Sequence, residues 1–336
     1  MNGSPLKIGV IGLGVGERHA DELSRNPRCE LVAVCDFDDD KIAWARSKYG
    51  SILVTRNVSD ILDHDKIDVV VVASYDNYHY EQIIHAVRNG KHVFVEKPLC
   101  LFEEEAKGIR GALDEKPGIH LSSNLILRKY PRFLSVKKMI DRGDMGDLFA
   151  VEGDYNYGRL HKIIDGWRGR IDFYSVVYGG GVHIIDLLLW LTGKKVVEVA
   201  AFGNNICSAG TNFRYNDMVV SVLKFSDGMV GKVSANFGCV YPHFHKISIY
   251  GTKATFENTL KEGVIYGSRD PMEMPLVIAG DYPGVNKGSL ASSFVDAIYE
   301  GKTPDVSTDD VFSAMSVCFA IEQSVRSGRS LPVTYI

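Results

Sequence analysis

The fold is decided close to the N-terminus by residues 8–16, which read Ile-Gly-Val-Ile-Gly-Leu-Gly-Val-Gly. The apolar run that opens this stretch is typical of a buried β-strand, and the spacing over residues 16–26 predicts a helix. A glycine-rich turn between a strand and a helix suits a dinucleotide, because glycine lets the backbone approach a pyrophosphate and the helix N-terminus offers N–H donors. The alternative is a tight turn of any α/β domain. We predict nucleotide contacts from Gly12, Gly14, Val15 and Gly16.

A carboxylate follows this turn in the expected place. Asp36 lies at the end of the next apolar run, residues 31–35, about 20 residues on, where an acid accepts hydrogen bonds from the adenosine ribose. Because a carboxylate repels a 2′-phosphate, we expect NAD, with NADP less favoured. The alternative is that Asp36 is a helix-capping or loop acid in the acidic run that follows it.

The first third of the chain alternates strand and helix patterns. Apolar runs at 67–73 and 92–95 are typical of strands in a parallel sheet, with helical crossovers between them. After about residue 121 the pattern changes to period-two alternation. We predict an α/β protein with an N-terminal Rossmann doubly wound parallel sheet (1–122) and a C-terminal α/β domain with a large, mostly antiparallel open sheet (123–336). The tail helices within 290–327 are candidates to pack back on the first domain.

The bulk composition excludes several classes of partner. A formal net charge of -4 over 336 residues gives no reason to expect nucleic acid. No apolar stretch reaches the ~20 residues that span a bilayer, so we expect no membrane partner. The six cysteines include no C-x-x-C pair, which predicts neither a disulfide framework nor a zinc knuckle. A reducing cytoplasm is the simplest location.

Two further strings carry candidate chemistry. Glu96-Lys97-Pro98 follows the strand-like run at 92–95, at the sheet edge where open α/β proteins bind ligands. Proline keeps the preceding lysine out of helical geometry, and Lys97 would polarise a substrate oxygen as hydride moves. The alternative is an ordinary charged surface loop.

The second string is Gly179-Gly180-Gly181 followed by Val182-His183-Ile184-Ile185-Asp186. An imidazole takes a hydroxyl proton near neutral pH, as alcohol oxidation requires, so His183 is a candidate base. Asp186, one helical turn later, shares its face and would orient or charge it. The alternative is a helix-start histidine with a structural partner.

A basic and aromatic cluster precedes this helix. Arginines and aromatic rings there favour an anionic, ring-bearing substrate, although a solvated basic loop explains the same composition. We expect substrate contacts from Lys97 and His183 and from a further set: Tyr157, Arg159, Trp167, Arg168 and His243. His243 and His245 share one side of a strand as a metal pair would, but with no obvious third ligand we expect no metal.

Together these segments resemble the glucose–fructose oxidoreductase / inositol dehydrogenase / rhizopine-catabolism (Gfo/Idh/MocA) family over essentially the whole chain. The resemblance implies that Lys97 is the catalytic lysine and His183 the catalytic histidine. It also implies that members oxidise sugars, cyclitols, sugar phosphates or nucleotide sugars and associate through the sheet face, here as a homodimer or homotetramer. It further places Ser74, His79, Glu96 and Asn124 in segments near the cofactor's ribose and nicotinamide.

Two departures from the family pattern stand out. The usual aspartate four residues before the histidine is Gly179 here, and the proline-asparagine step after the fourth strand reads Tyr75-Asp76. Both bear on the acid–base mechanism.

The sequence therefore predicts an NAD-dependent sugar or cyclitol dehydrogenase. Two alternatives stay open. One is a redox-neutral enzyme, similar to a glycosidase branch of the family, that holds its nucleotide tightly. The other is a non-catalytic sensor of nicotinamide or sugar on the same fold.

Overall fold

A computed structural model describes residues 4–278 and 280–336 of the chain. The chain forms two compact units. The parallel-sheet unit comprises residues 1–124, 286–312 and 336, and the open-sheet unit comprises residues 125–285 and 313–335. Each is described by itself.

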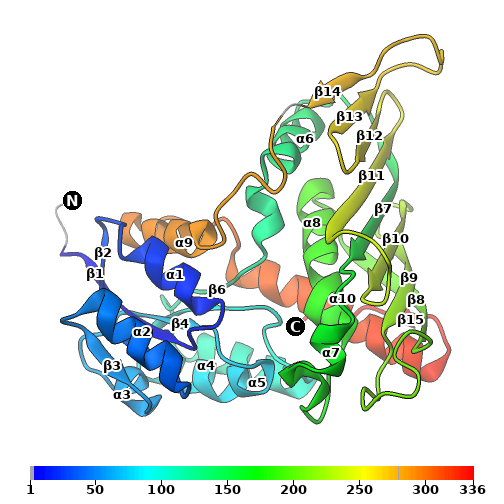
Figure 1. The fold of residues 1–336 in the computed structure, drawn as a ribbon. Helices are drawn as coiled ribbons and strands as arrows, with labels where there is room; N and C mark the ends of the chain where they lie inside the picture. Colours follow the sequence, from blue (N-terminus) through cyan, green and yellow to red (C-terminus); the bar gives the residue numbers. More distant parts are fainter. Residues whose placement is uncertain (1–3, 279) are drawn as a thin grey trace. The chain divides into compact units, whose positions relative to one another are not determined.

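The parallel-sheet unit is built on six strands in the order β3-β2-β1-β4-β5-β6 (Figure 1). Every neighbouring pair is parallel, and the order reverses at β1, as in a doubly wound sheet. All four residues of β4 are valines, and all are buried, as the continuous apolar run predicts. The strands are β1 (Leu6–Ile11), β2 (Cys29–Cys35), β3 (Leu53–Thr55), β4 (Val69–Val72), β5 (His92–Val95) and β6 (Leu121–Ser123).

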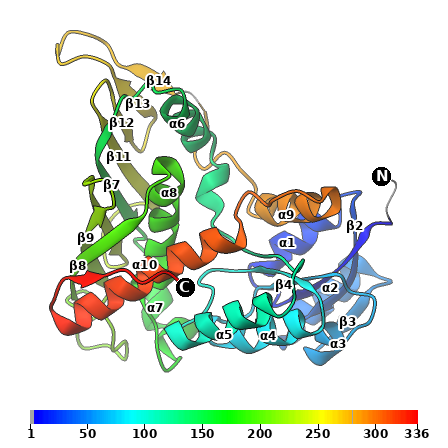
Figure 2. The same cartoon turned by 180° about the vertical axis from the view of Figure 1, so that it is seen from behind.

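Helices cover both faces of this sheet. Figure 2 shows α1, α2 and α9 on one face and the three remaining helices on the other. The late helix α9 is tied to this unit by side chains, because Asn26 donates to Ser292 and Asp296. The helices are α1 (Gly16–Leu23), α2 (Asp39–Tyr49), α3 (Ser59–Leu62), α4 (His79–Arg88), α5 (Glu103–Asp114) and α9 (Ser289–Glu300).

The open-sheet unit has nine strands in the order β14-β13-β12-β11-β7-β10-β9-β8-β15. Only the central pair β7 and β10 is parallel, and the other neighbours are antiparallel. Along β7, Val151, Gly153 and Tyr155 are buried while the residues between them are partly exposed. The strands are β7 (Leu148–Asn156), β8 (Val196–Asn204), β9 (Met218–Phe225), β10 (Val230–Asn236), β11 (Phe244–Gly251), β12 (Thr255–Asn258), β13 (Gly263–Tyr266), β14 (Leu276–Ile278) and β15 (Leu331–Pro332).

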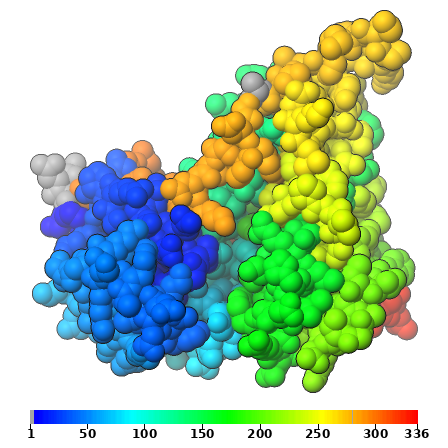
Figure 3. Space-filling model, in the orientation of Figure 1, coloured from blue at the N-terminus to red at the C-terminus, as the bar shows by residue number. Residues whose placement is uncertain are grey.

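The helices of this unit lie on one face of its sheet (Figure 1). A five-residue π-helix, η4 (Val177–Gly181), runs directly into α8, which ends at Thr192 and is followed by Gly193 in the left-handed conformation. The α-helices are α6 (Pro131–Asp141), α7 (His161–Ile164), α8 (Val182–Thr192) and α10 (Thr308–Ser327), which belongs to this unit from residue 313 onward. The residues between β13 and β14, drawn in amber, form a projection from the sheet end (Figure 3).

The predicted fold class is confirmed in both sheets. The main elements that the pattern missed are α5 and the π-helix η4. The first turn of α5 carries three glutamates in succession, which masked its apolar period. A π-turn adds one residue to each hydrogen-bonded loop, so no helical or strand period reveals it. Within the described part of the chain, no helix has the length and apolarity needed to cross a membrane.

Candidate active site

The predicted nucleotide residues gather at one edge of the parallel sheet. The glycine turn follows β1, Asp36 follows β2, Glu96 and Lys97 follow β5, and Asn124 follows β6. Because these strands are parallel, their carboxyl ends lie along the same edge, which is where open α/β sheets bind ligands. Ser74 lies just beyond β4 at this edge and donates its hydroxyl to Gln82 at 2.8 Å.

The glycine turn has the shape that a bound anion requires. Gly12 has φ +86°, and a Cβ there would lie 2.4 Å from the Ala73 carbonyl oxygen. At Gly14 a Cβ would meet no atom within 4 Å, so this backbone borders open space. No side chain caps the N-terminus of α1 at Val15. The turn therefore leaves room and amide donors at a helix N-terminus that begins with Gly16.

Asp36 is linked to the turn. Its Oδ2 accepts from the Leu13 amide at 2.5 Å, and its Oδ1 accepts from the Asp38 amide at 2.9 Å. Asp38, not Asp36, caps α2, through the amides of Asp40 and Lys41. The helix-capping alternative for Asp36 is therefore wrong, and its carboxylate keeps further lone pairs for a ribose.

Lys97 is held through both of its neighbours. Glu96 accepts from Asn124 Nδ2 at 2.7 Å, and its carboxylate lies 2.9 Å from His19 Nε2. On the other side, the Pro98 carbonyl oxygen lies 2.7 Å from His79 Nδ1. Both imidazoles have no exposed surface. The His79 contact thus fixes the loop at Pro98.

The Glu96 carboxylate stays ionised although it is buried. Burial raises its pKa, but the hydrogen bond and charge of His19, the charge of Lys97 and the Asn124 amide together lower it to about 2. Glu96 therefore places a fixed negative charge beside Lys97.

Two of the three glycines before His183 face tyrosines that leave no room for a side chain. A Cβ on Gly179 would lie 2.0 Å from the Tyr174 hydroxyl oxygen, and a Cβ on Gly180 would lie 2.4 Å from the Tyr155 ring. The Tyr155 ring in turn stacks on the His183 imidazole, with centroids 6.0 Å apart and 17° between the planes. The side chain absent at Gly179 is replaced in space by a tyrosine hydroxyl.

Asp186 has a buried partner that the sequence pattern does not reveal. Arg128 donates to both of its carboxylate oxygens, from Nε at 3.0 Å and from Nη2 at 2.6 Å. Both side chains are buried. This bidentate pair attaches α8 to the segment after β6, and removing either partner would leave a buried charge.

Of the expected substrate residues of the open-sheet unit, Tyr157, His183 and His243 pack around Tyr155. His243 packs edge-on against Tyr155 and Tyr157, with centroid distances of 5.3 and 5.2 Å. The Arg159 guanidinium lies 5.3 Å from the Tyr157 ring centroid, and Arg168 lies 4.5 Å from that of Trp167. Burial raises the pKa of Tyr155 well above its usual value, and the positive charge of Arg168 opposes this shift only weakly.

His245 belongs to this aromatic cluster as a neutral residue. Its Nδ1 lies 2.6 Å from the Tyr282 hydroxyl. Burial, and to a smaller extent His243, lower its pKa to about 3. Among residues 4–278 and 280–336, no group of three or more His, Cys, Asp or Glu side chains is arranged to hold a metal ion.

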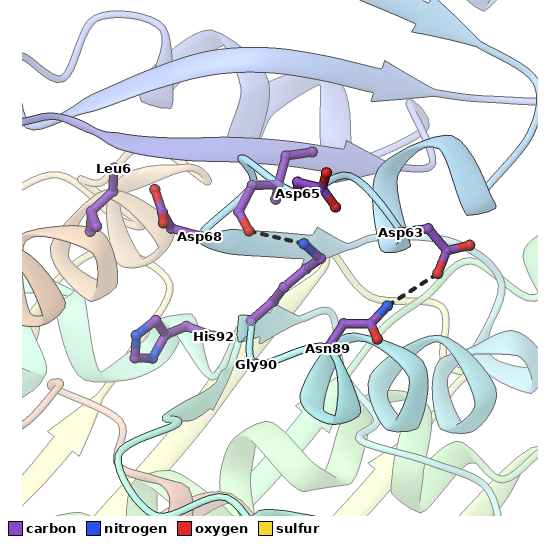
Figure 4. Close-up of a pocket in the computed structure, with 9 residues that line it drawn as sticks. Leu6, Asp63, Asp65, Asp68, Asn89, Gly90 and His92 are labelled. Atoms are coloured by element: carbon purple, nitrogen blue, oxygen red, sulfur yellow. Dashed lines mark hydrogen bonds between the residues drawn. The ribbon is translucent and has the colours of Figure 1, made fainter.

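A separate cavity of about 530 Å³ lies near the amino ends of β1, β4 and β5 (Figure 4). Asp63, Asp65 and Asp68 border it, and Asn89 donates to Asp63. The Lys91 amine donates to the carbonyls of His64 and Ile67. This cavity is at the sheet edge opposite the candidate site.

Two family models match this chain. Residues 6–123 match the oxidoreductase family with an NAD-binding Rossmann fold, and residues 133–257 match the GFO/IDH/MocA C-terminal domain. The chain belongs to the Gfo/Idh/MocA oxidoreductase family. Its parallel-sheet unit is thus an NAD-binding Rossmann domain, and the predicted family and cofactor are confirmed.

Similar proteins span nearly the whole of this Gfo/Idh/MocA chain. Myo-inositol 2-dehydrogenase of Thermotoga maritima is 25% identical over 97% of this chain and 98% of its own. NAD-dependent scyllo-inositol 2-dehydrogenase of Bacillus subtilis is 25% identical over 96% and 95%. A levoglucosan dehydrogenase solved with NADH has a TM-score of 0.87 at 22% identity, covering 99% of this chain and 100% of that one.

Several site residues of this family member escaped the sequence analysis. Tyr155 had a signal, since it stands two residues before Tyr157 and their rings stack with centroids 5.8 Å apart. His19 carries no local sign of its contact with Glu96, which lies 77 residues away. Arg128 carries no signal either, because its partner lies 58 residues away.

Proposed function

We propose that this protein is an NAD-dependent dehydrogenase that transfers hydride between a hydroxyl-bearing carbon of a sugar or cyclitol and nicotinamide. The observation that carries the proposal is the strand-end Lys97, held through both neighbours at the ligand-binding edge of an NAD-binding Rossmann domain. Relatives named as inositol and levoglucosan dehydrogenases support the substrate class.

The turn fits a dinucleotide. Open space at Gly14 and the uncapped N-terminus of α1 suit a pyrophosphate, and Asp36 suits the adenosine ribose. Bound NAD supplies the hydride acceptor. The carboxylate of Asp36 favours NAD over NADP.

Each proposed catalytic group has one task. Lys97 contacts the reacting oxygen and stabilises the negative charge that develops there. His183 accepts the hydroxyl proton, since a neutral imidazole is a competent base near pH 7. Asp186 acts on His183 from the same helix face, with its own position fixed by Arg128.

A panel of substrates tests the proposal. The purified protein is incubated with NAD and with myo-inositol, scyllo-inositol or levoglucosan, and NADH absorbance is followed. The proposal expects NADH from at least one member of the sugar and cyclitol class. Turnover without added NAD and without net NADH would identify the redox-neutral alternative, and binding without turnover would identify the sensor.

The basic side chains narrow the substrate further. Arg159 is exposed beside Tyr157, and Arg168 lies over the Trp167 ring. We infer a preference for a sugar that bears a carboxylate or a phosphate, because guanidinium groups bind both. Higher kcat/KM for a sugar acid or nucleotide sugar than for neutral inositol or glucose supports this preference, and the reverse order excludes it.

Assembly and location complete the proposal. The outer face of the nine-stranded sheet carries the exposed residues Val222 and Val230, and β8 adds Phe202, so we propose a homodimer or homotetramer through this face. Light scattering at working concentration tests it, and a monomer excludes it. All six cysteines are free thiols, which is compatible with a cytoplasmic location.

A further inference from the structure

The last helix of the open-sheet unit supplies a buried carboxylic acid with no role in the proposed chemistry. Glu322 of α10 is 8% exposed. Burial raises its pKa, while the Ser175 hydrogen bond and the charge of Arg326 act in the opposite direction. A buried acid that holds a specific hydrogen bond is retained at a cost in free energy, so its contacts indicate what it does.

Glu322 reaches the chain just before the π-helix. The Ser175 hydroxyl donates to Glu322 Oε1. The same hydroxyl oxygen accepts from the amides of Val177 and Tyr178, at 3.1 and 3.2 Å. Ser175 is therefore oriented by Glu322 on one side and holds the first amides of η4 on the other.

The π-helix leads directly to His183. It ends at Gly181, and α8 begins at Val182, so the turn held by Ser175 sets where the imidazole is directed. Three of the five residues of η4 are glycines, so the half of the turn next to α8 has no side chains of its own with which to fix its conformation. Contacts from other elements are therefore needed to hold η4. π-turns are often found at functional sites.

Helix α10 packs against the same elements at neighbouring positions. Phe319 packs edge-on against Tyr178 of η4, with centroids 5.5 Å apart. Cys318, one residue before Phe319, is buried, and burial is the main reason why the pKa of its thiol lies well above the usual value. Through Phe319 and Glu322, α10 therefore contacts both η4 and the serine that precedes it.

We propose that Glu322 is a positioning residue that acts through Ser175 and the π-helix to hold the His183 imidazole in its working orientation. The proposal rests on the proposed role of His183 as the base. It assigns a function to the C-terminal helix α10. Sequence patterns do not indicate this function, because α10 lies far from His183 in the chain.

The test follows the His183 ring by NMR in protein labelled at histidine Cε1, with the signal assigned by its loss in His183→Asn. Glu322→Ala and Ser175→Ala are expected to shift and broaden this signal. Glu322→Gln, which keeps an acceptor for the Ser175 hydroxyl, is expected to restore it. Gln323→Ala removes an exposed neighbour on the same helix and serves as the matched control.

Activity measurements distinguish the positioning role of Glu322 from the proposed role of His183 as the base. Glu322→Ala is expected to lower kcat about 10- to 100-fold with the KM for NAD unchanged, as a misdirected base would. In a His183→Ala background it is expected to cause no further loss. A His183 signal at its normal position and width in stable Glu322→Ala protein overturns the positioning role, as does equal damage from Glu322→Gln. Full activity in His183→Ala overturns the proposed function instead, whatever the ring signal does. Should Glu322→Ala not fold, Ser175→Ala decides by the same criteria.

Discussion

Lys97 and His183 are held by different physical means. In the parallel-sheet unit, hydrogen bonds from two buried imidazoles fix the residues on either side of Lys97. In the open-sheet unit, close packing places His183: two tyrosines fill the space beside Gly179 and Gly180, and one of them stacks on the imidazole. Hydrogen bonds fix the orientation and the charge of the groups that they join, whereas close packing fixes the space that a side chain can occupy. Substitutions in the two regions should therefore lower activity and stability through different causes.

The largest effect is expected from the two proposed catalytic groups themselves. Lys97→Ala and His183→Ala should each lower kcat about 10²- to 10⁴-fold, since each removes a group that acts on the reacting oxygen or its proton. Steady-state kinetics on the best substrate of the panel measures it. Thermal shifts by NAD should persist in His183→Ala, which shows that the Rossmann domain is intact. Near-normal kcat in both variants would remove these roles.

The next effect tests the hydrogen-bonded side of the comparison. His19→Leu leaves the buried Glu96 carboxylate with one fewer partner, and should cost about 3 kcal/mol of unfolding free energy at pH 7. His85→Leu is the matched control, because His85 pairs with Asp63 at 2.6 Å on the surface and should cost under about 1 kcal/mol. Denaturant unfolding compares them. Equal losses of unfolding free energy in the two variants would mean that the buried His19–Glu96 pair stabilises the fold no more than the exposed His85–Asp63 pair does.

The same pair predicts a pH dependence. The pKa of Glu96 is about 2 in the folded protein against 4.5 for the free side chain. The stabilisation is therefore fully present above about pH 4.5 and is lost as the pH falls towards 2. Glu96→Gln should therefore lose less stability than the wild type as the pH falls from 4.5 towards 2. An equal loss in both proteins would contradict the conclusion that the Glu96 carboxylate is ionised in the folded protein.

A smaller effect tests the packed side. Gly179→Ala places a Cβ against the Tyr174 hydroxyl and should cost about 1–3 kcal/mol through overpacking. Gly111→Ala in α5 is the control, since a Cβ there meets no atom within 4 Å and should stabilise by about 0.5–1 kcal/mol. The aspartate usual at position 179 in the family should be tolerated no better than alanine. A stable, fully active Gly179→Asp protein would show that Tyr174 moves aside freely.

The smallest effect concerns acid stability of the aromatic cluster. The pKa of His245 is about 3 when folded against 6.5 when free, so its neutral form stabilises the fold above pH 6.5 and this stability is lost on acidification. Between pH 7 and 5, the wild type should lose about 2 kcal/mol more than His245→Asn does. His161→Asn changes an exposed histidine and should lose as much stability between pH 7 and 5 as the wild type does. Parallel losses in all three proteins would exclude the neutral buried form.

The sequence predicted the two sheets and the edge where the site residues gather, because strand periodicity and glycine turns are local signals. It did not predict the contacts that fix those residues. His19 meets Glu96 across 77 positions and Ser175 meets Glu322 across 147. Gly179 illustrates the limit: the residue type showed that an aspartate was absent, but only packing shows that Tyr174 occupies the space. Such contacts depend on tertiary structure and leave no period in the chain.

The most direct test of the central claim is the transfer of hydrogen from substrate carbon to nicotinamide. The panel substrate that gives the highest rate, with scyllo-inositol as the first choice, is prepared with deuterium on its carbinol carbons and incubated with NAD. The account predicts deuterium in the NADH nicotinamide ring, and loss of this transfer in Lys97→Ala. Turnover of panel sugars with no deuterium in NADH, or binding of NAD and sugar with no turnover across the panel, would contradict it.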